Sequence, residues 1–116
     1  MNASTRRAVA YIAGGIVAQF SRSHVYDHDA SEHFAFSGAV GATSCNTYDH
    51  DRGCHITGSP PQLYDHGNQK HLTLEVKGQA FSGYDFDSQQ HFSGRVNGSS
   101  ITLYDHGDGA HHNYSI

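Results

Sequence analysis

A motif repeated five times supplies most of the side chains in this sequence that are capable of chemistry. The motif, Tyr-Asp-(His/Phe)-(Asp/Gly)-x-x-x-His, begins at Tyr26, Tyr48, Tyr64, Tyr84 and Tyr104. Each copy brings a phenol, a carboxylate and at least one imidazole together in a short segment. Carboxylate and imidazole are ligands that zinc, nickel and copper accept, and aromatic rings beside hydrogen-bonding groups are typical of recognition surfaces. The motif therefore predicts metal binding or ligand recognition.

Metal binding would use the acidic and imidazole side chains of these segments. Asp-His-Asp occurs in the first two copies, and the last copy is followed by a second histidine. The twelve-residue calcium loop and the glycine-rich nonapeptide repeat are both absent from the sequence. A divalent metal is thus a possible cofactor that nothing in the sequence requires. The candidate ligands are Asp27, Asp29, Asp49, His50, Asp51, His106, Asp108, His111 and His112. The alternative is that these side chains are solvated and only shape the turns.

Ligand recognition would use the tyrosine and the last histidine of each copy, which always lie seven positions apart. The candidate binding residues are Tyr26, His33, Tyr48, His55, Tyr64, His71, Tyr84, His91, Tyr104 and His111. A row of such pairs on a sheet would suit a carbohydrate or a protein ligand. Self-association is a third possibility, because segment 112–116 and an N-terminal hairpin are expected as exposed strand edges. The structural alternative is a half-buried seam that stiffens the hairpins.

Catalysis is not expected. The sequence contains no Gly-x-Ser-x-Gly elbow, and no histidine is distinguished from its copies by its surroundings. An active site needs one asymmetric arrangement, whereas a repeated Asp-His pair is explained by duplication of a turn. We therefore expect a non-catalytic binding or structural module.

The elements that position these residues are antiparallel strands. Polar residues fill each copy and alternating apolar residues flank it, so each copy is predicted to be a tight connection between two strands. Other turns, such as Asn97-Gly98, alternate with these connections. The predicted fold is an all-β up-and-down meander of about ten short strands, closed as a β-sandwich or barrel. All five Tyr-Asp turns should then lie along one rim.

The alternation also predicts the strand register and its two faces. The tyrosine and the last histidine of each copy should be cross-strand partners on one face. The pairs expected on the opposite, apolar face are Val25/Phe34, Thr47/Ile56, Leu63/Leu72, Gly83/Phe92 and Leu103/His112.

The chain is expected to form one domain, residues 1–116, with the five repeats in residues 24–116. Residues 1–22 are interpreted as a hairpin, with strands 8–12 and 16–20 around Ala13-Gly14-Gly15. The less favoured interpretation is a secretory signal, in which Arg6 and Arg7 precede an apolar stretch. A cytoplasmic location is slightly favoured over secretion.

Several classes of protein are excluded by composition. The net charge is −4 with only seven Lys and Arg, which gives no footprint for nucleic acid. No apolar run is long enough for a membrane-spanning helix. Cys45 should pair with Gly58 across the strands, four residues from Cys54, which is beyond disulfide reach. Two reduced cysteines are therefore expected.

Overall fold

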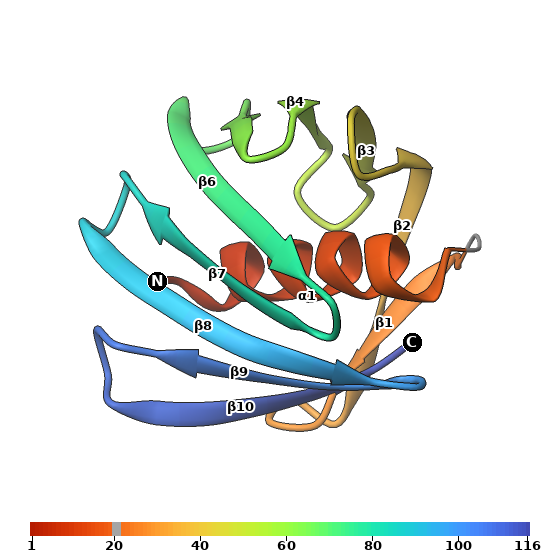
Figure 1. Ribbon diagram of the computed structural model, residues 1–116, viewed down its shortest axis with the longest axis vertical. Helices are drawn as coiled ribbons and strands as arrows, with labels where there is room; N and C mark the ends of the chain where they lie inside the picture. Colours follow the sequence, from red (N-terminus) through yellow and green to blue (C-terminus); the bar gives the residue numbers. More distant parts are fainter. Residues whose placement is uncertain (20–21) are drawn as a thin grey trace.

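The computed structural model describes residues 1–19 and 22–116, and it shows a closed barrel of ten antiparallel strands around one central helix. Figure 1 shows this helix, α1, enclosed by the strands. The elements are α1 (Ala3–Ala18), β1 (His24–Asp27), β2 (Glu32–Val40), β3 (Cys45–Asp49), β4 (Cys54–Ser59), β5 (Gln62–Asp65), β6 (Lys70–Lys77), β7 (Ala80–Asp85), β8 (Gln90–Asn97), β9 (Ser100–Asp105) and β10 (Ala110–Ser115).

The predicted meander and its register are confirmed. Each strand pairs with the next one in sequence, and β1 closes the barrel against β10. Each of the five motif tyrosines lies opposite the last histidine of its own copy. The five apolar-face pairs also occur as predicted, with Val25 opposite Phe34 as the first. Because successive strands alternate in direction, the five Tyr-Asp turns lie at one end of the barrel, which we call the Tyr-Asp rim.

The hairpin predicted at the N-terminus is wrong: most of this segment is helix α1. Phe20, the end of the second predicted strand, lies outside the described residues. The Asn2 side chain accepts a hydrogen bond from the Thr5 amide at 2.8 Å and caps the first turn. Residues 8–14 are all buried, so the helix is surrounded by protein on every side. The Gly-Gly pair interpreted as a turn lies inside this helix.

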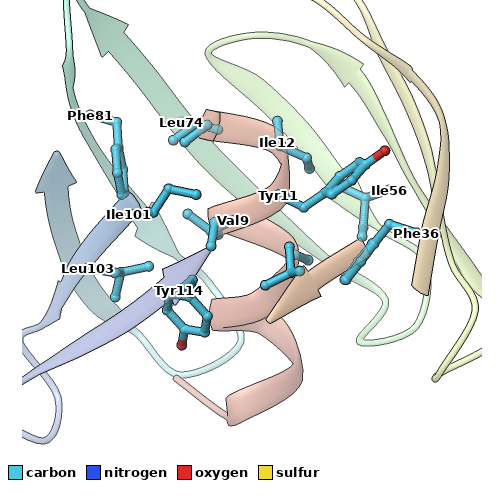
Figure 2. Close-up of a cluster of buried hydrophobic side chains, with 14 of the residues drawn as sticks. Val9, Tyr11, Ile12, Phe36, Ile56, Leu74, Phe81, Ile101, Leu103 and Tyr114 are labelled. Carbon is cyan, nitrogen blue, oxygen red and sulfur yellow. The ribbon is translucent and has the colours of Figure 1, made fainter. Parts of the chain in front are cut away.

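The glycines of α1 are explained by the narrow interior of the barrel. A Cβ on Gly14 would lie 2.7 Å from the Cδ1 atom of Ile116, and one on Gly15 would lie 2.9 Å from Cγ1 of Val40. The large side chains of the helix, such as Ile12, point into gaps between wall residues (Figure 2). Tyr11 stacks on Phe36 with ring centroids 4.8 Å apart. Small residues are therefore required where the helix backbone approaches the wall.

The barrel closes at a short seam. Only two residue pairs join β1 to β10, Tyr26 with Ser115 and Asp27 with Tyr114, whereas β1 and β2 share four. Strand β10 pairs with β9 on one side and β1 on the other, so the exposed edge predicted at residues 112–116 is wrong. Cys45 lies opposite Gly58 as predicted, and both cysteines are free. In the described part of the chain, no helix has the length and apolar character to cross a membrane.

Candidate functional site

The motif tyrosines and histidines form a belt around the outside of the barrel, close to the Tyr-Asp rim. In every copy the tyrosine is half-buried and the last histidine is exposed. Their rings lie with centroids 4.7 to 4.9 Å apart, tilted or edge to face. Aromatic pairs favour this geometry. The belt thus combines firmly packed tyrosines with solvent-accessible imidazoles.

The third residue of each copy adds a second ring to the same tyrosine. His28, His50, His66 and His106 contact their tyrosines edge on, with centroids 4.8 to 4.9 Å apart. Each of these four tyrosines therefore lies between two imidazoles. The fourth copy has Phe86 at this position, 4.8 Å from Tyr84. Phe86 is 47% exposed and is the one large apolar side chain classed as exposed among the described residues.

A hydroxyl residue completes each copy of the belt; it comes from the preceding strand in four copies and from β10, across the seam, in the first. The residues opposite the five tyrosines on that side are Ser115, Ser37, Thr57, Thr73 and Ser93. Three of these hydroxyls lie 2.8 to 3.0 Å from Nε2 of the third-position histidine. In the fourth copy, where that histidine is replaced, Thr73 accepts a hydrogen bond from the Tyr84 amide instead. We define the outer belt as these hydroxyl residues with the motif tyrosines, their last histidines and their third residues.

The aspartates of the motif point the other way, into the barrel. The inner carboxylate ring consists of Asp27, Asp49, Asp65, Asp85 and Asp105, each at most 3% exposed. Each accepts at least one amide hydrogen bond from its own turn, as for Asp27 with the Asp29 amide at 2.9 Å. The alternative in which all acids of the turns are solvated is wrong for these five, because strand alternation places the residue after an outward tyrosine on the inner face.

Cations from the helix and from one turn neutralise most of this ring. Arg7 Nε lies 2.9 Å from Asp27, and Arg6 Nη1 lies 3.2 Å from Asp105. The amino group of Met1 is also 3.3 Å from Asp105. The two arginines interpreted above as the charged start of a secretory signal therefore hold α1 inside the barrel. Their guanidinium groups face the motif aspartates.

Arg52 joins two members of the ring. Its Nε lies 2.7 Å from Asp49, and its Nη2 lies 3.0 Å from Asp65. Burial by itself would lower the pKa of the Arg52 guanidinium. Its hydrogen bonds to the two carboxylates together outweigh this effect, so the pKa is raised. Asn68 donates to Asp65 and to Thr5 of the helix, at 3.3 and 2.9 Å. The Tyr-Asp rim is thus filled by a network of charges and hydrogen bonds.

Three of the nine predicted metal ligands meet at the seam. Nδ1 of His112 hydrogen-bonds with Asp29, and its Nε2 lies 2.9 Å from Asp108. One carboxylate oxygen of Asp105, one of Asp108 and one ring nitrogen of His112 all lie within 4.8 Å of one another. His112 thus lies between two carboxylates, with one at each ring nitrogen. Burial would raise the pKa of Asp108, but bonds from His112 and the Ala110 amide lower it overall.

The other predicted metal ligands lie apart. Asp27 and Asp49 are paired with arginines inside the barrel. His50, His106 and His111 belong to the outer belt. Asp51 is exposed on its turn.

Sequence reasoning missed the hydroxyl residues of the belt and the arginine partners of the ring. A signal for the former was present, since Ser37, Thr73 and Ser93 each stand eleven positions before a motif tyrosine. Arg52 lies only three positions after Asp49, but the helix arginines had no local signal, because Arg6 and Asp105 are 99 residues apart in sequence.

Known proteins provide no guide to this site: no protein-family model matches the chain, and no curated protein or solved structure shows significant similarity to it.

Proposed function

We propose that this protein is a non-catalytic carbohydrate-binding module that uses its outer belt. The observation that carries the proposal is the fivefold arrangement of a packed tyrosine with accessible imidazole and hydroxyl groups on the outside of the barrel. Sugars combine C–H faces, which pack on aromatic rings, with many hydroxyls that need hydrogen-bond partners. The belt offers both kinds of contact within each copy.

Two features favour this ligand class and this location. Helix α1 fills the interior, so the outer surface is where the barrel can present its repeated side chains. The core of a protein interface typically buries several large apolar or aromatic residues. Phe86 is the one large apolar side chain classed as exposed in the described chain. A surface rich in imidazole and hydroxyl groups with little exposed apolar area suits a polyhydroxylated ligand better than a protein.

The test is binding to immobilised polysaccharides, both neutral (dextran, mannan, xylan) and acidic (polygalacturonate). A variant with alanine at the five exposed last histidines of the motif should lose retention, while circular dichroism should remain unchanged because these side chains are outside the core. A matched variant with alanine at Gln79 and Ser99, exposed positions at the opposite rim, should bind like the native protein. Equal retention of the two variants would contradict the proposal. Failure of the native protein to bind any of the polysaccharides would contradict it too.

Metal binding at the seam is a second candidate function, favoured by the proximity of Asp105, Asp108 and His112. A metal ion would have to replace one of the contacts that the ring nitrogens of His112 make with Asp29 and Asp108, because coordination requires a free nitrogen lone pair. Zinc titration by calorimetry should show saturable binding. His112→Gln should abolish this signal. Saturable zinc heat that persists in this variant would place the metal elsewhere.

A further inference from the structure

We propose that the belt takes an acidic oligosaccharide, and that this chain lies in one groove across the outer face of β5 to β9. This inference rests on the carbohydrate-binding function proposed above and assigns its ligand charge and its location. It follows from where the structure places the surface cations, the exposed Phe86 and the small side chains of the wall.

The groove consists of three adjoining hollows on the outer wall. The first, of about 520 Å³, is lined by Gln62, Lys70 and Phe86 among others. The second, of about 550 Å³, shares Gln62 with the first and adds Tyr84 and His91 of the belt. The third, of about 420 Å³, continues past Tyr104 and Arg95. Neighbouring hollows share lining residues, so the three adjoin along the outer wall.

Small side chains explain why the depression lies on this part of the barrel. Ser82 of β7 is the cross-strand partner of Ser93 of β8, and both line the second and third hollows. Larger residues rise on either side of this pair, with Tyr84 two positions along β7 and Arg95 two positions along β8. The two serines therefore form the floor of the groove and present hydroxyl groups there. Tyr84 lies on one side of them and Arg95 on the other.

The distribution of charge identifies an anionic ligand. Of the seven lysines and arginines in the chain, Arg6, Arg7 and Arg52 pair with the inner carboxylate ring. Lys70, Lys77 and Arg95 all line the groove, although the chain as a whole carries a net charge of −4. The one acidic residue that lines it is Glu75, whose carboxylate lies 3.2 Å from the Lys77 ammonium. The groove is thus a cationic region on an otherwise acidic protein.

The positions of these cations fit an extended chain. Lys70 and Lys77 are the first and last residues of β6, which places them about 23 Å apart along an extended strand. Their odd separation turns the two side chains to opposite faces of the strand, so Lys70 reaches the groove from the Tyr-Asp rim, where it is exposed. Phe86 lies beside Lys70 at one end of the groove, and Arg95 lies beside Lys77 at the other. An oligosaccharide with a carboxylate or sulfate on successive sugars would meet a cation at each end. Its sugar faces would pack on Phe86 and on the belt aromatics between them.

The fourth copy of the motif supports this location. Phe86 replaces the third-position histidine that the other four copies carry, and it is the member of the belt classed as an exposed large apolar residue. The Phe86 side chain is only partly buried at this position, and about half of it stays in contact with solvent. An aromatic ring held edge to face against Tyr84 with its surface accessible is a stacking platform for a sugar.

The experiment is calorimetric titration of the full chain with oligogalacturonates from monomer to hexamer, sulfated dextran oligomers and neutral dextran oligomers. We expect affinity to rise with the length of the acidic oligomers until the groove is filled, and to fall as salt is added. Lys70→Ala, Arg95→Ala and Phe86→Ala should each weaken binding about fivefold to tenfold. The preference between galacturonate and sulfated oligomers identifies which anionic group the cations hold.

Two matched controls separate this inference from the broader proposal. Asn46→Asp changes the net charge by the same −1 as Lys70→Ala, but at an exposed position on β3 outside the groove. Thr43→Ala removes an exposed hydroxyl between β2 and β3, outside both the belt and the groove. Both should bind acidic oligomers like the native protein. Equal affinity for neutral oligomers, a loss in the control variants equal to that in the groove variants, or tighter binding of a single-stranded oligonucleotide would overturn the inference. In the first two outcomes carbohydrate binding would stand; if no saccharide binds, both proposals fail.

Discussion

Arg52 is the residue whose removal should cost the most stability among the charged side chains of the rim. Its guanidinium contacts Asp49 at 2.7 Å and Asp65 at 3.0 Å, and those two carboxylates are 1% and 2% exposed. Arg52→Ala leaves both as buried charges that retain only hydrogen bonds from their turns and from Asn68. Breaking a buried ion pair from one side costs about 3 to 5 kcal/mol. That is a large fraction of the roughly 5 to 15 kcal/mol by which domains are stable.

Urea unfolding followed by circular dichroism measures this loss, because the chain has no tryptophan to report on it. Arg52→Lys keeps the charge, but a single ammonium replaces the planar group that reaches both carboxylates, so the loss should be intermediate. Lys77→Ala is the matched control. It breaks an ion pair whose side chains are 81% and 57% exposed, which is typically worth about 0 to 1 kcal/mol.

A double-mutant cycle tests the cause of the loss. If the penalty arises from unpaired buried charge, Asp65→Asn in the Arg52→Ala background should recover part of the stability, since it removes one of the two carboxylates. The reasoning is refuted if Arg52→Ala costs no more than Lys77→Ala. It is also refuted if Asp65→Asn lowers stability in that background as much as it does alone.

Three further predictions concern pH and the space inside the barrel. Burial raises the pKa of Tyr114 from 10.0 to about 12. The free energy of unfolding should therefore stay constant below about pH 10 and fall by about 3 kcal/mol toward pH 12. Urea titrations at alkaline pH should show that Tyr114→Phe removes this dependence. The pKa of Asp108 is lowered in the folded protein, so its carboxylate stabilises the fold above the usual carboxyl pKa and this contribution is lost in acid. The melting temperature of His112→Gln should therefore depend less on pH than that of the native protein between about pH 5 and pH 3. Gly83→Ala should lower the melting temperature more than Gly14→Ala. The new Cβ at position 83 would lie 1.9 Å from a backbone oxygen, whereas the one at position 14 would lie 2.7 Å from the end of a flexible side chain. Equal melting temperatures of the two variants would contradict this.

The repeats determined the wall of the barrel from the sequence alone. Strict alternation fixed which face each residue occupies, and the constant spacing from tyrosine to histidine fixed the register, as in the pair Tyr64 and His71. The same alternation, applied one residue further, places the motif aspartate inside the barrel. That consequence of the pattern was available from the sequence, although the pairing of Asp27 and Asp105 with arginines of the helix was not.

Local sequence could not reveal the role of the N-terminal segment. The sequence pattern of its glycines and alanines is compatible with a turn and with a secretory signal. In the folded protein, small residues stand at these positions because a closed wall surrounds the helix. Arg6 and Arg7 face aspartates from distant turns. The groove likewise exists only once β5 to β9 lie side by side and bring Lys70, Lys77 and Arg95 to one surface. The period of two along a strand is a local property that sequence alone determines. The choice between sandwich and barrel, the filling of the interior and the assembly of charges from separate turns depend on closure, which joins residues about a hundred positions apart.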